Sequence, residues 1–282
     1  MRRIILVLAI FIFSSTIYAQ QLVLGTYNLR YKNNTDSGNL WTQRAPVVAA
    51  LIRYHDFDVL GTQEAIDAQL SDLVTMLPAY ARVGVGRDDG KKAGEHAAIL
   101  YKKDKFKLLK AGNFWLSPTP DTPTMGWDAK CCKRLCSWVY LEDKATHSRF
   151  YFFNAHYDHE GMIARAESSK LILTRIKALA GTAPVIFTGD LNGGRDTDWY
   201  KTIASSGILT DSYTQAANPY ASNGSFNGFG TTLNDSAVID HIFLSKEFRT
   251  QKWAILTDTY RGKFPSDHFP VLATVTLKPT HK

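Results

Sequence analysis

Several short segments place carboxylate, amide and imidazole side chains at the ends of apolar stretches. Asp190 and Asn192 follow one such stretch, and Asp267 and His268 precede another. Polar residues at the ends of buried strands are how a rigid sheet presents a reactive site. Cleavage of a phosphate ester needs a cation to neutralise phosphate oxygens, an oriented water and a stabilised leaving oxygen. These residue types can supply all three, so the sequence predicts this kind of chemistry.

A sparse set of oxygen ligands is available for a divalent cation. Asn28 ends the first strand-like stretch, Glu64 follows the second and Asp267 precedes the last. Magnesium and manganese prefer such hard oxygen ligands, usually a few carboxylates with water completing the shell. We therefore predict a Mg2+ or Mn2+ site at Asn28, Glu64 and Asp267, although Glu64 could instead cap the helix that follows it.

The other polar residues suit the attacking water and the phosphate. Asp190 and Asn192 could orient the water and hold a phosphate oxygen, while two histidines, His156 and His268, donate to the phosphate. Taken singly, each has an ordinary alternative. Asp190 could be a turn residue, and His156 could be a buried histidine with satisfied hydrogen bonds.

The elements that must position these residues are strands mixed with helices. Strands are predicted at residues 22–29, 58–63, 97–101, 137–141, 150–155, 185–188, 237–244 and 271–277. Helical patterns cover residues 43–54, 66–76, 164–179 and 199–204. Some strands follow one another directly, which argues against a βα barrel. We predict an α+β fold, a four-layer α/β/β/α sandwich of two packed, mostly antiparallel sheets with helices on both outer faces.

The first residues have the pattern of a signal peptide. Arg2 and Arg3 precede an apolar run over residues 4–13, and Ala19 supplies a small residue for cleavage. The run is too short to span a bilayer, although an uncleaved anchor is the alternative. We expect residues 1–19 to be removed and residues 20–282 to form one catalytic domain without a transmembrane segment. The protein is then exported, to the periplasm or the extracellular space.

Composition adds weaker constraints. With 282 residues, 45% of them hydrophobic, the chain can bury one large core. Its formal charge of +7 suits an anionic substrate. A lysine-rich run over residues 102–110 is interpreted as a solvated strand and turn rather than a nucleic-acid track. The cysteines, Cys131, Cys132 and Cys136, could form a disulfide that includes Cys136 or remain buried thiols.

Together, the polar segments resemble the endonuclease/exonuclease/phosphatase superfamily, which includes deoxyribonuclease I. The matching segments are TYNLR at residues 26–30, GTQEA at 61–65, NAHYDH at 154–159, TGDLN at 188–192, IDHIF at 239–243 and SDHFPV at 266–271. Intervening segments, such as SFNGF at 225–229, resemble a secreted bacterial subgroup near the deadenylase-like branch. The match covers essentially the whole chain after residue 19.

The resemblance implies a role for each polar residue. Glu64 is the principal metal ligand, with Asn28 and Asp267 beside it. Asp190 aligns or deprotonates the water with help from Asn192. The pair Asp240 and His268 contacts the phosphate that is cleaved, and His156 stabilises a phosphate oxygen or the leaving group.

Substrate contacts are predicted from residues around this set. Arg134 and Arg165 are candidates for phosphate contacts, with structural ion pairs as the alternative. Trp115 and Phe226, with Trp127 and Phe229, could form an aromatic rim or belong to the core. Asp158 and His159 could contact substrate or support their neighbours. The segment at residues 84–94 lacks a following Gly-Lys-Ser/Thr and is interpreted as a flexible loop, not a nucleotide cradle.

We therefore expect a monomeric, metal-dependent phosphodiesterase or phosphatase whose substrate is a nucleic acid, a sugar phosphate or a lipid head group. A secreted endonuclease on DNA or RNA is the main alternative. No long basic stripe with interleaved aromatic residues is found, which favours a smaller substrate. A sphingomyelinase-type enzyme lacks an identifiable membrane-binding hairpin. A non-catalytic binding domain is disfavoured because the whole polar set is retained.

Overall fold

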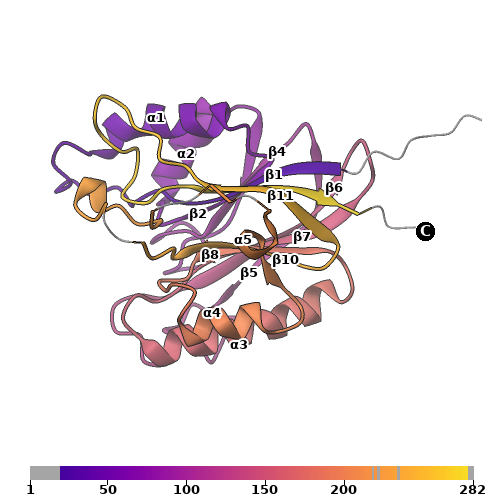
Figure 1. The fold of residues 1–282 in the computed structure, drawn as a ribbon. Helices are drawn as coiled ribbons and strands as arrows, with labels where there is room; N and C mark the ends of the chain where they lie inside the picture. The colour runs from indigo at the N-terminus through magenta and orange to yellow at the C-terminus, as the bar shows by residue number, and fades with distance from the viewer. Residues whose placement is uncertain (1–19, 218, 221–222, 234–235, 279–282) are drawn as a thin grey trace, which may run out of the picture.

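The computed structural model describes residues 20–217, 219–220, 223–233 and 236–278, so the predicted signal peptide lies outside the described residues. The chain forms two six-stranded sheets that face each other (Figure 1). The first sheet has the strand order β11 (Phe248–Ile255), β12 (Val271–Leu277), β1 (Gln20–Asn28), β2 (Val59–Gln63), β4 (Ala98–Lys102) and β3 (Tyr80–Val83). The second has the order β5 (Phe106–Trp115), β6 (Leu135–Asp143), β7 (Arg149–His156), β8 (Val185–Asp190), β10 (Asp240–Leu244) and β9 (Thr210–Asp211).

Helices cover both outer faces of this pair of sheets. Helices α1 (Trp41–Tyr54) and α2 (Asp67–Met76) lie outside the first sheet, while α3 (Met162–Ala180) and α4 (Asp198–Ala204) lie outside the second (Figure 1). A short helix, α5 (Ser212–Gln215), follows β9. The predicted four-layer α/β/β/α sandwich is thus confirmed, and the four predicted helices start and end within two residues of the observed ones.

Each sheet contains one parallel pair of strands at its centre, and the helix that connects the pair crosses the outer face. Strands β1 and β2 are parallel and are joined through α1, and β7 and β8 are parallel and are joined through α3. The other pairings are antiparallel. Because the carboxyl ends of parallel strands meet at one edge of a sheet, residues that follow β1, β2, β7 and β8 can converge.

The apolar side chains form a core in each of the three gaps between layers. The gap between the sheets holds residues such as Leu24, Ile99, Phe152, Ile186 and Val275, all fully buried. A second cluster packs α3 and α4 against the second sheet, and a third packs α1 and α2 against the first. Burial of this kind is the main stabilising contribution to folding.

One buried polar side chain, Asn154 of β7, connects the two sheets within this apolar gap. Its Nδ2 atom donates hydrogen bonds to the main-chain oxygens of Thr62, at 2.9 Å, and Ala98, at 3.0 Å, both in the opposite sheet. Its Oδ1 atom accepts from Gln63 Nε2 at 2.7 Å and from Thr188 Oγ1 at 3.1 Å. All four hydrogen-bonding positions of the amide are therefore used.

The strands that the sequence did not indicate are β3, β9, β11 and the part of β5 beyond the lysine-rich run. Strands β5 and β11 are edge strands, and much of their length is exposed, so they lack the apolar run of a central strand. The lysine-rich run forms the end of β4, a turn and the start of β5, as predicted. Two of its members, Lys102 and Lys105, make ion pairs with Asp58 at 2.9 and 2.7 Å.

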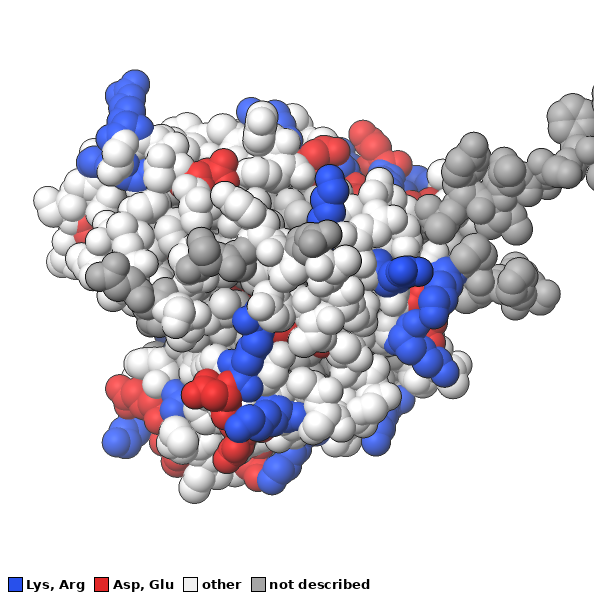
Figure 2. All heavy atoms as spheres, in the orientation of Figure 1, with Lys and Arg blue, Asp and Glu red and all other residues white. Residues whose placement is uncertain are grey.

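The surface charges are mixed on the face drawn in Figure 2. Lys and Arg side chains lie there in separate groups, several of them next to Asp and Glu side chains. In the described part of the chain, no helix is both long enough and apolar enough to cross a membrane.

Replacement of Asn154 by alanine should lower the free energy of unfolding by about 2–4 kcal/mol, because buried donors and acceptors in both sheets lose their partner. Urea denaturation of the purified variant measures this loss. The control is Gln251→Ala, which removes an exposed amide whose side-chain oxygen accepts a hydrogen bond from Gln21. Equal stability of the Asn154→Ala variant and the wild type would show that the amide is not a significant link between the sheets.

Candidate active site

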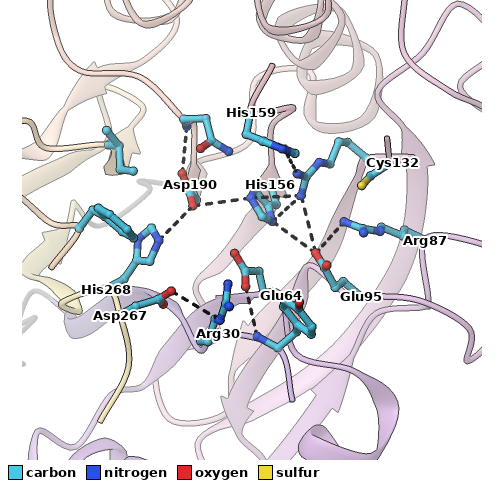
Figure 3. Close-up of a pocket in the computed structure, with 15 residues that line it drawn as sticks. Arg30, Glu64, Arg87, Glu95, Cys132, His156, His159, Asp190, Asp267 and His268 are labelled. Atoms are coloured by element: carbon cyan, nitrogen blue, oxygen red, sulfur yellow. Dashed lines mark hydrogen bonds and ion pairs between the residues drawn. The ribbon is translucent and has the colours of Figure 1, made fainter. Parts of the chain in front are cut away.

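The polar residues at the strand ends surround one cavity at a single edge of the sandwich. Asn28 ends β1, Glu64 directly follows β2, His156 ends β7 and Asp190 ends β8. The antiparallel neighbours add residues where they begin, because Asp240 is the first residue of β10 and pairs with Asp190. The cavity has a volume of about 680 Å³, and Figure 3 shows the residues that line it.

The backbone turns sharply where three of these residues enter the cavity. Arg30, Glu64 and Asn192 have φ angles of 55°, 66° and 47°, in the left-handed region that residues with a Cβ atom rarely adopt. Each lies just after a strand of a central parallel pair. Such conformations persist only where surrounding contacts hold them, and they concentrate at functional sites.

Asn28 holds the carboxylates of Glu64 and Asp190 close to each other. Its Nδ2 atom donates to Glu64 Oε1 and to Asp190 Oδ2, both at 3.0 Å, and its Oδ1 atom accepts from the main-chain nitrogen of Arg30. Asn28 is fully buried behind these residues and does not line the cavity. The structure therefore places its amide nitrogen toward the cavity residues, and its oxygen is already used by the backbone.

Glu64 and Asp267 are the carboxylates best placed to hold a cation. Burial raises the pKa of Asp267 to about 6; the neighbouring Glu64 adds to the rise, while His268 and Arg30 oppose it. Two partly desolvated carboxylates that repel each other, together with the oxygen chemistry of the set, fit a hard divalent cation.

A second group of possible ligand atoms comprises Asp190, Asp240 and His268, which lie within 4.8 Å of one another. His268 Nδ1 and Asp240 Oδ2 are 2.9 Å apart, in hydrogen-bonding contact. Burial is the largest single effect and disfavours the charged imidazole, but the charge and hydrogen bond of Asp240, together with Asp190 and Asp267, outweigh it and raise the pKa of His268 to about 10. Because the contact with Asp240 already occupies His268 Nδ1, we favour the Glu64 and Asp267 pair for the cation.

Asp190 lies between the two histidines with both of its oxygens engaged. Oδ1 accepts from the main-chain nitrogen of Asn192 at 2.9 Å, and Oδ2 is 3.6 Å from His156 Nε2 and 3.8 Å from His268 Nε2. Burial, followed by the nearby charge of Asp240, raises the pKa of Asp190 to about 6. A carboxylate with a pKa near 6 is a stronger proton acceptor than an ordinary aspartate.

His156 and His268 have opposite charge states. Burial and the adjacent Arg134 lower the pKa of His156 well below its ordinary value, so this ring is neutral. Arg134 Nη1 is 2.9 Å from His156 Nδ1. Figure 3 shows His156 between Asp190 and Glu95 and His268 beside Asp190. The cavity therefore presents one imidazolium and one neutral imidazole to a ligand.

Of the predicted substrate contacts, Arg134, His159 and Phe226 line the cavity, whereas Arg165, Asp158, Trp115, Trp127 and Phe229 do not. Arg165 packs over the ring of Trp199 at 4.5 Å and donates to the main-chain oxygen of Asp158. Asp158 Oδ1 accepts from the backbone before α3. Trp115 is buried and donates from Nε1 to the main-chain oxygen of Arg87. These residues support the site in the structure rather than bordering the cavity.

Several residues that line the cavity, above all Arg87 and Glu95, were not indicated by any sequence pattern. The segment that contains Arg87 is a hydrogen-bonded hairpin rather than the expected flexible loop: the Arg87 nitrogen donates to the Glu95 oxygen, and the Asp88 nitrogen to the Ala93 oxygen. The hairpin brings Arg87 Nη1 to 2.6 Å from Glu95 Oε2. No local pattern reveals such a pair, because it depends on how the hairpin packs. Arg30, Tyr31 and Ile239 also line the cavity and lie within or beside recognised segments.

The predicted disulfide pairings of the cysteines were wrong. Cys131 and Cys132 form a disulfide with each other, and Cys136 is a buried free thiol. The predicted disulfides required Cys136, which instead lies at the start of β6, where it packs in the core between the second sheet and its helices. Cys132 lines the cavity, so the disulfide lies at its wall.

A four-layer sandwich with this polar edge defines a metal-dependent hydrolase of phosphoric esters. The family model described as the Endonuclease/Exonuclease/phosphatase family matches residues 25–268. The chain therefore belongs to the endonuclease/exonuclease/phosphatase family, and the predicted resemblance is confirmed. Its members are phosphoric ester hydrolases, and this protein is an enzyme of that class.

Solved structures show where in the family the chain belongs. A family member from Bacteroides thetaiotaomicron is 45% identical, with a TM-score of 0.90 over 93% of this chain and 100% of that chain. A mannosyl-6-phosphatase of the same organism is 46% identical, with a TM-score of 0.88 over 90% and 99% of the two chains. The human Nocturnin catalytic domain, 18% identical with a TM-score of 0.72 over 92% and 94%, shares the fold.

More distant sequence relatives include two uncharacterized proteins of Acanthamoeba polyphaga mimivirus. They are 23% and 26% identical over 80% and 82% of this chain. The chain spans 38% of the length of the first protein and 91% of the second.

Replacement of Asp240 by asparagine should lower kcat by about 100- to 1000-fold, the size of the effect when a charged stabilising group is lost. Because Asp240 raises the pKa of His268, its loss lowers that pKa, and the alkaline limb of the pH profile of kcat/KM should move to lower pH. The control is Asp258→Asn, which removes the acid from a more exposed pair between Asp258 and His55, 3.0 Å apart. An unshifted alkaline limb in the Asp240→Asn variant would contradict an imidazolium role for His268.

Proposed function

We propose that the protein is an exported phosphomonoesterase that uses Mg2+ or Mn2+ and releases phosphate from phosphorylated sugars. The observation that carries the proposal is the arrangement around the cavity: the carboxylates of Glu64, Asp267 and Asp190 and both histidines line the same cavity. A phosphate bound there would meet a cation site, a proton acceptor and an imidazolium together. A divalent cation bound at Glu64 and Asp267 would neutralise negative charge on the phosphate oxygens.

The residues of the chain then have distinct tasks. Asp190, held by Asn28 and by the Asn192 nitrogen, accepts a proton from the attacking water. Asn192, which donates to the Tyr157 oxygen, helps to position that water or a phosphate oxygen. His268, kept protonated by Asp240, donates to a phosphate oxygen and balances the charge that develops there. Neutral His156, oriented by Arg134, donates to another phosphate oxygen or to the leaving oxygen.

Two observations favour a small monoester over a nucleic acid. The described cavity has acidic Glu95 at its end beside Arg87, where the next phosphate of a polynucleotide would be repelled. On the face drawn in Figure 2, the basic side chains lie in separate groups rather than along one track. The 46% identity with a mannosyl-6-phosphatase, over 90% of this chain, supports a phosphorylated sugar as the substrate.

Export is proposed from the first residues of the sequence. The basic start, the apolar run over residues 4–13 and Ala19 have the order and size of a signal peptide. We propose that the enzyme works as a monomer in the periplasm or outside the cell.

The purified protein should release inorganic phosphate from hexose 6-phosphates and from p-nitrophenyl phosphate in the presence of Mg2+ or Mn2+, and EDTA should abolish the release. The panel also contains bis-p-nitrophenyl phosphate, plasmid DNA, RNA and sphingomyelin. Turnover of only the diesters or nucleic acids would overturn the monoesterase proposal. No turnover of any substrate with either metal would overturn the proposed metal-dependent hydrolysis. Full activity after replacement of both Glu64 and Asp190 by alanine would refute the site assignment.

Expression of the full chain in a bacterial host should yield protein outside the cytoplasm that begins at Gln20, because cleavage is expected after Ala19. Cell fractionation followed by N-terminal sequencing measures both properties. A matched variant with Arg2 and Arg3 replaced by glutamate should accumulate uncleaved in the cytoplasm. Uncleaved wild-type protein in the membrane fraction would instead favour the anchor alternative.

A further inference from the structure

One end of the cavity carries polar groups of which only Arg134, through its contact with His156, takes part in the proposed chemistry. Arg87, Glu95, Arg134 and His159 lie there, and Figure 3 shows Arg87 and Glu95 on the side away from Asp267 and His268. Arg87 Nη1 donates to Glu95 Oε2 at 2.6 Å, and Arg134 Nη1 is 3.7 Å from the same oxygen. Arg134 Nη2 donates to His159 Nδ1 at 2.9 Å. We call these four residues the distal cluster.

The distal cluster is held in place before any ligand binds. The hairpin bond from the Arg87 nitrogen to the Glu95 oxygen fixes the two residues relative to each other, and Trp115 Nε1 donates to the Arg87 oxygen at 2.8 Å. The side chains of Arg134, Arg87 and Glu95 retain exposures of only 7%, 14% and 17%. Charged groups lose hydration when they are buried, so these side chains need the contacts that hold them in place. A largely buried cluster that is fixed in this way offers a ligand a preorganised surface, unlike a pair of mobile surface side chains.

The charges of the distal cluster disfavour a second anion. Glu95 is paired with Arg87 and approached by Arg134, and Asp158 Oδ2 lies 4.0 Å from Arg134 Nε. Two acidic groups thus accompany the two guanidinium groups. A second phosphate at this end would contact the Glu95 carboxyl group as well as the arginines, whereas a neutral group would not be repelled.

The hydrogen-bonding capacity of the cluster matches hydroxyl groups. Among the described residues, no donor bonds to Glu95 Oε1, which can accept from a ligand. The hydrogen bond from Arg87 to Glu95 uses one of the two terminal nitrogens of Arg87. A hydroxyl group donates one hydrogen bond and accepts others, so neighbouring hydroxyls can bond to a carboxyl oxygen and a guanidinium together. Burial also raises the pKa of Glu95 to about 7, against the effect of Arg87, so this group can donate as well as accept near neutral pH.

We propose that Glu95, flanked by Arg87 and Arg134, binds hydroxyl groups of the sugar part of the substrate and determines its specificity. This inference rests on the proposed function, since it assumes that the phosphate occupies the end of the cavity at Asp190 and His268. The distal cluster then separates phosphorylated polyols from phosphate esters that have no hydroxyl groups.

The test is the ratio of kcat/KM for a hexose 6-phosphate to kcat/KM for phenyl phosphate, measured with Mg2+ for each variant. Glu95→Gln, which keeps the shape of the side chain, should lower this ratio roughly 10- to 100-fold, because bonds to a charged group are lost. Arg87→Lys keeps the charge but loses the planar fork, and should lower the ratio by a smaller factor. Glu167→Gln on the outside of α3, where Glu167 pairs with Lys170, is the matched control and should leave the ratio unchanged.

Thermal unfolding of each variant separates loss of specificity from loss of folding, because a folded variant keeps a cooperative transition near that of the wild type. An unchanged ratio in folded Glu95→Gln and Arg87→Lys variants would overturn the inference. Faster turnover of a sugar bisphosphate by the Glu95→Gln variant than by the wild type would also overturn it. The arginines would then form an anion-binding site that the charge of Glu95 keeps anions out of in the wild type. A wild type that hydrolyses phenyl phosphate but shows no preference for hexose phosphates would refute the inference and leave the esterase activity standing. Failure of the wild type on both substrates would refute the proposed function itself.

Discussion

The site depends on the amide of Asn154, which links the two sheets directly beneath it. Its four bonds reach β2, β4 and β8, and the residues it contacts neighbour those that act in the cavity. Gln63 precedes Glu64, Thr188 lies two residues before Asp190, and Asn154 itself lies two residues before His156. One buried group therefore helps to set the distance of Glu64 from Asp190 and His156. Space is equally restricted on the facing strand, since a Cβ atom at Gly61 would overlap Asn154 and Thr188.

Burial creates reactive groups at this edge without any unusual residue. Two aspartates, Asp190 and Asp267, lose hydration and become better proton acceptors, while His268 is held positive by the acids around it. His156 is held neutral by burial and by Arg134. The negative charges near Glu64 and Asp267 are therefore incompletely balanced by positive groups. At the distal cluster, the acidic and basic groups nearly balance each other. Under the proposed function, a cation and a phosphate would complete the balance at one end, and uncharged groups of the substrate would suit the other.

The sequence predicts those features that repeat along a strand or helix. The central strands and the helices have strong apolar patterns, and a polar residue just after such a strand must lie at the sheet edge, so Glu64, His156 and Asp190 could be assigned. Edge strands such as β5 and β11 were missed because half-exposed residues weaken that pattern. Glu95 was missed for another reason: it reaches the cavity only because a hairpin folds back onto Trp115. Asp158 belongs to a matching segment, and Arg165 and Trp115 lie between such segments, but sequence order cannot tell a lining residue from one placed just behind it.

The pairing of β1 with β12 has a practical consequence for the molecule. Gln20 pairs with Leu277 at one end of these strands, whereas Asn28 and Asp267 lie at the other end, close to the cavity. At about 3.3 Å per residue, the nine residues of β1 separate the paired ends from the site by roughly 25–30 Å. A peptide linker from Leu277 to Gln20 would connect two neighbouring strands, so the fold suits circular permutation at this point. Attachment of the enzyme to a bead or an electrode through either end would leave the entrance of the cavity facing the solution.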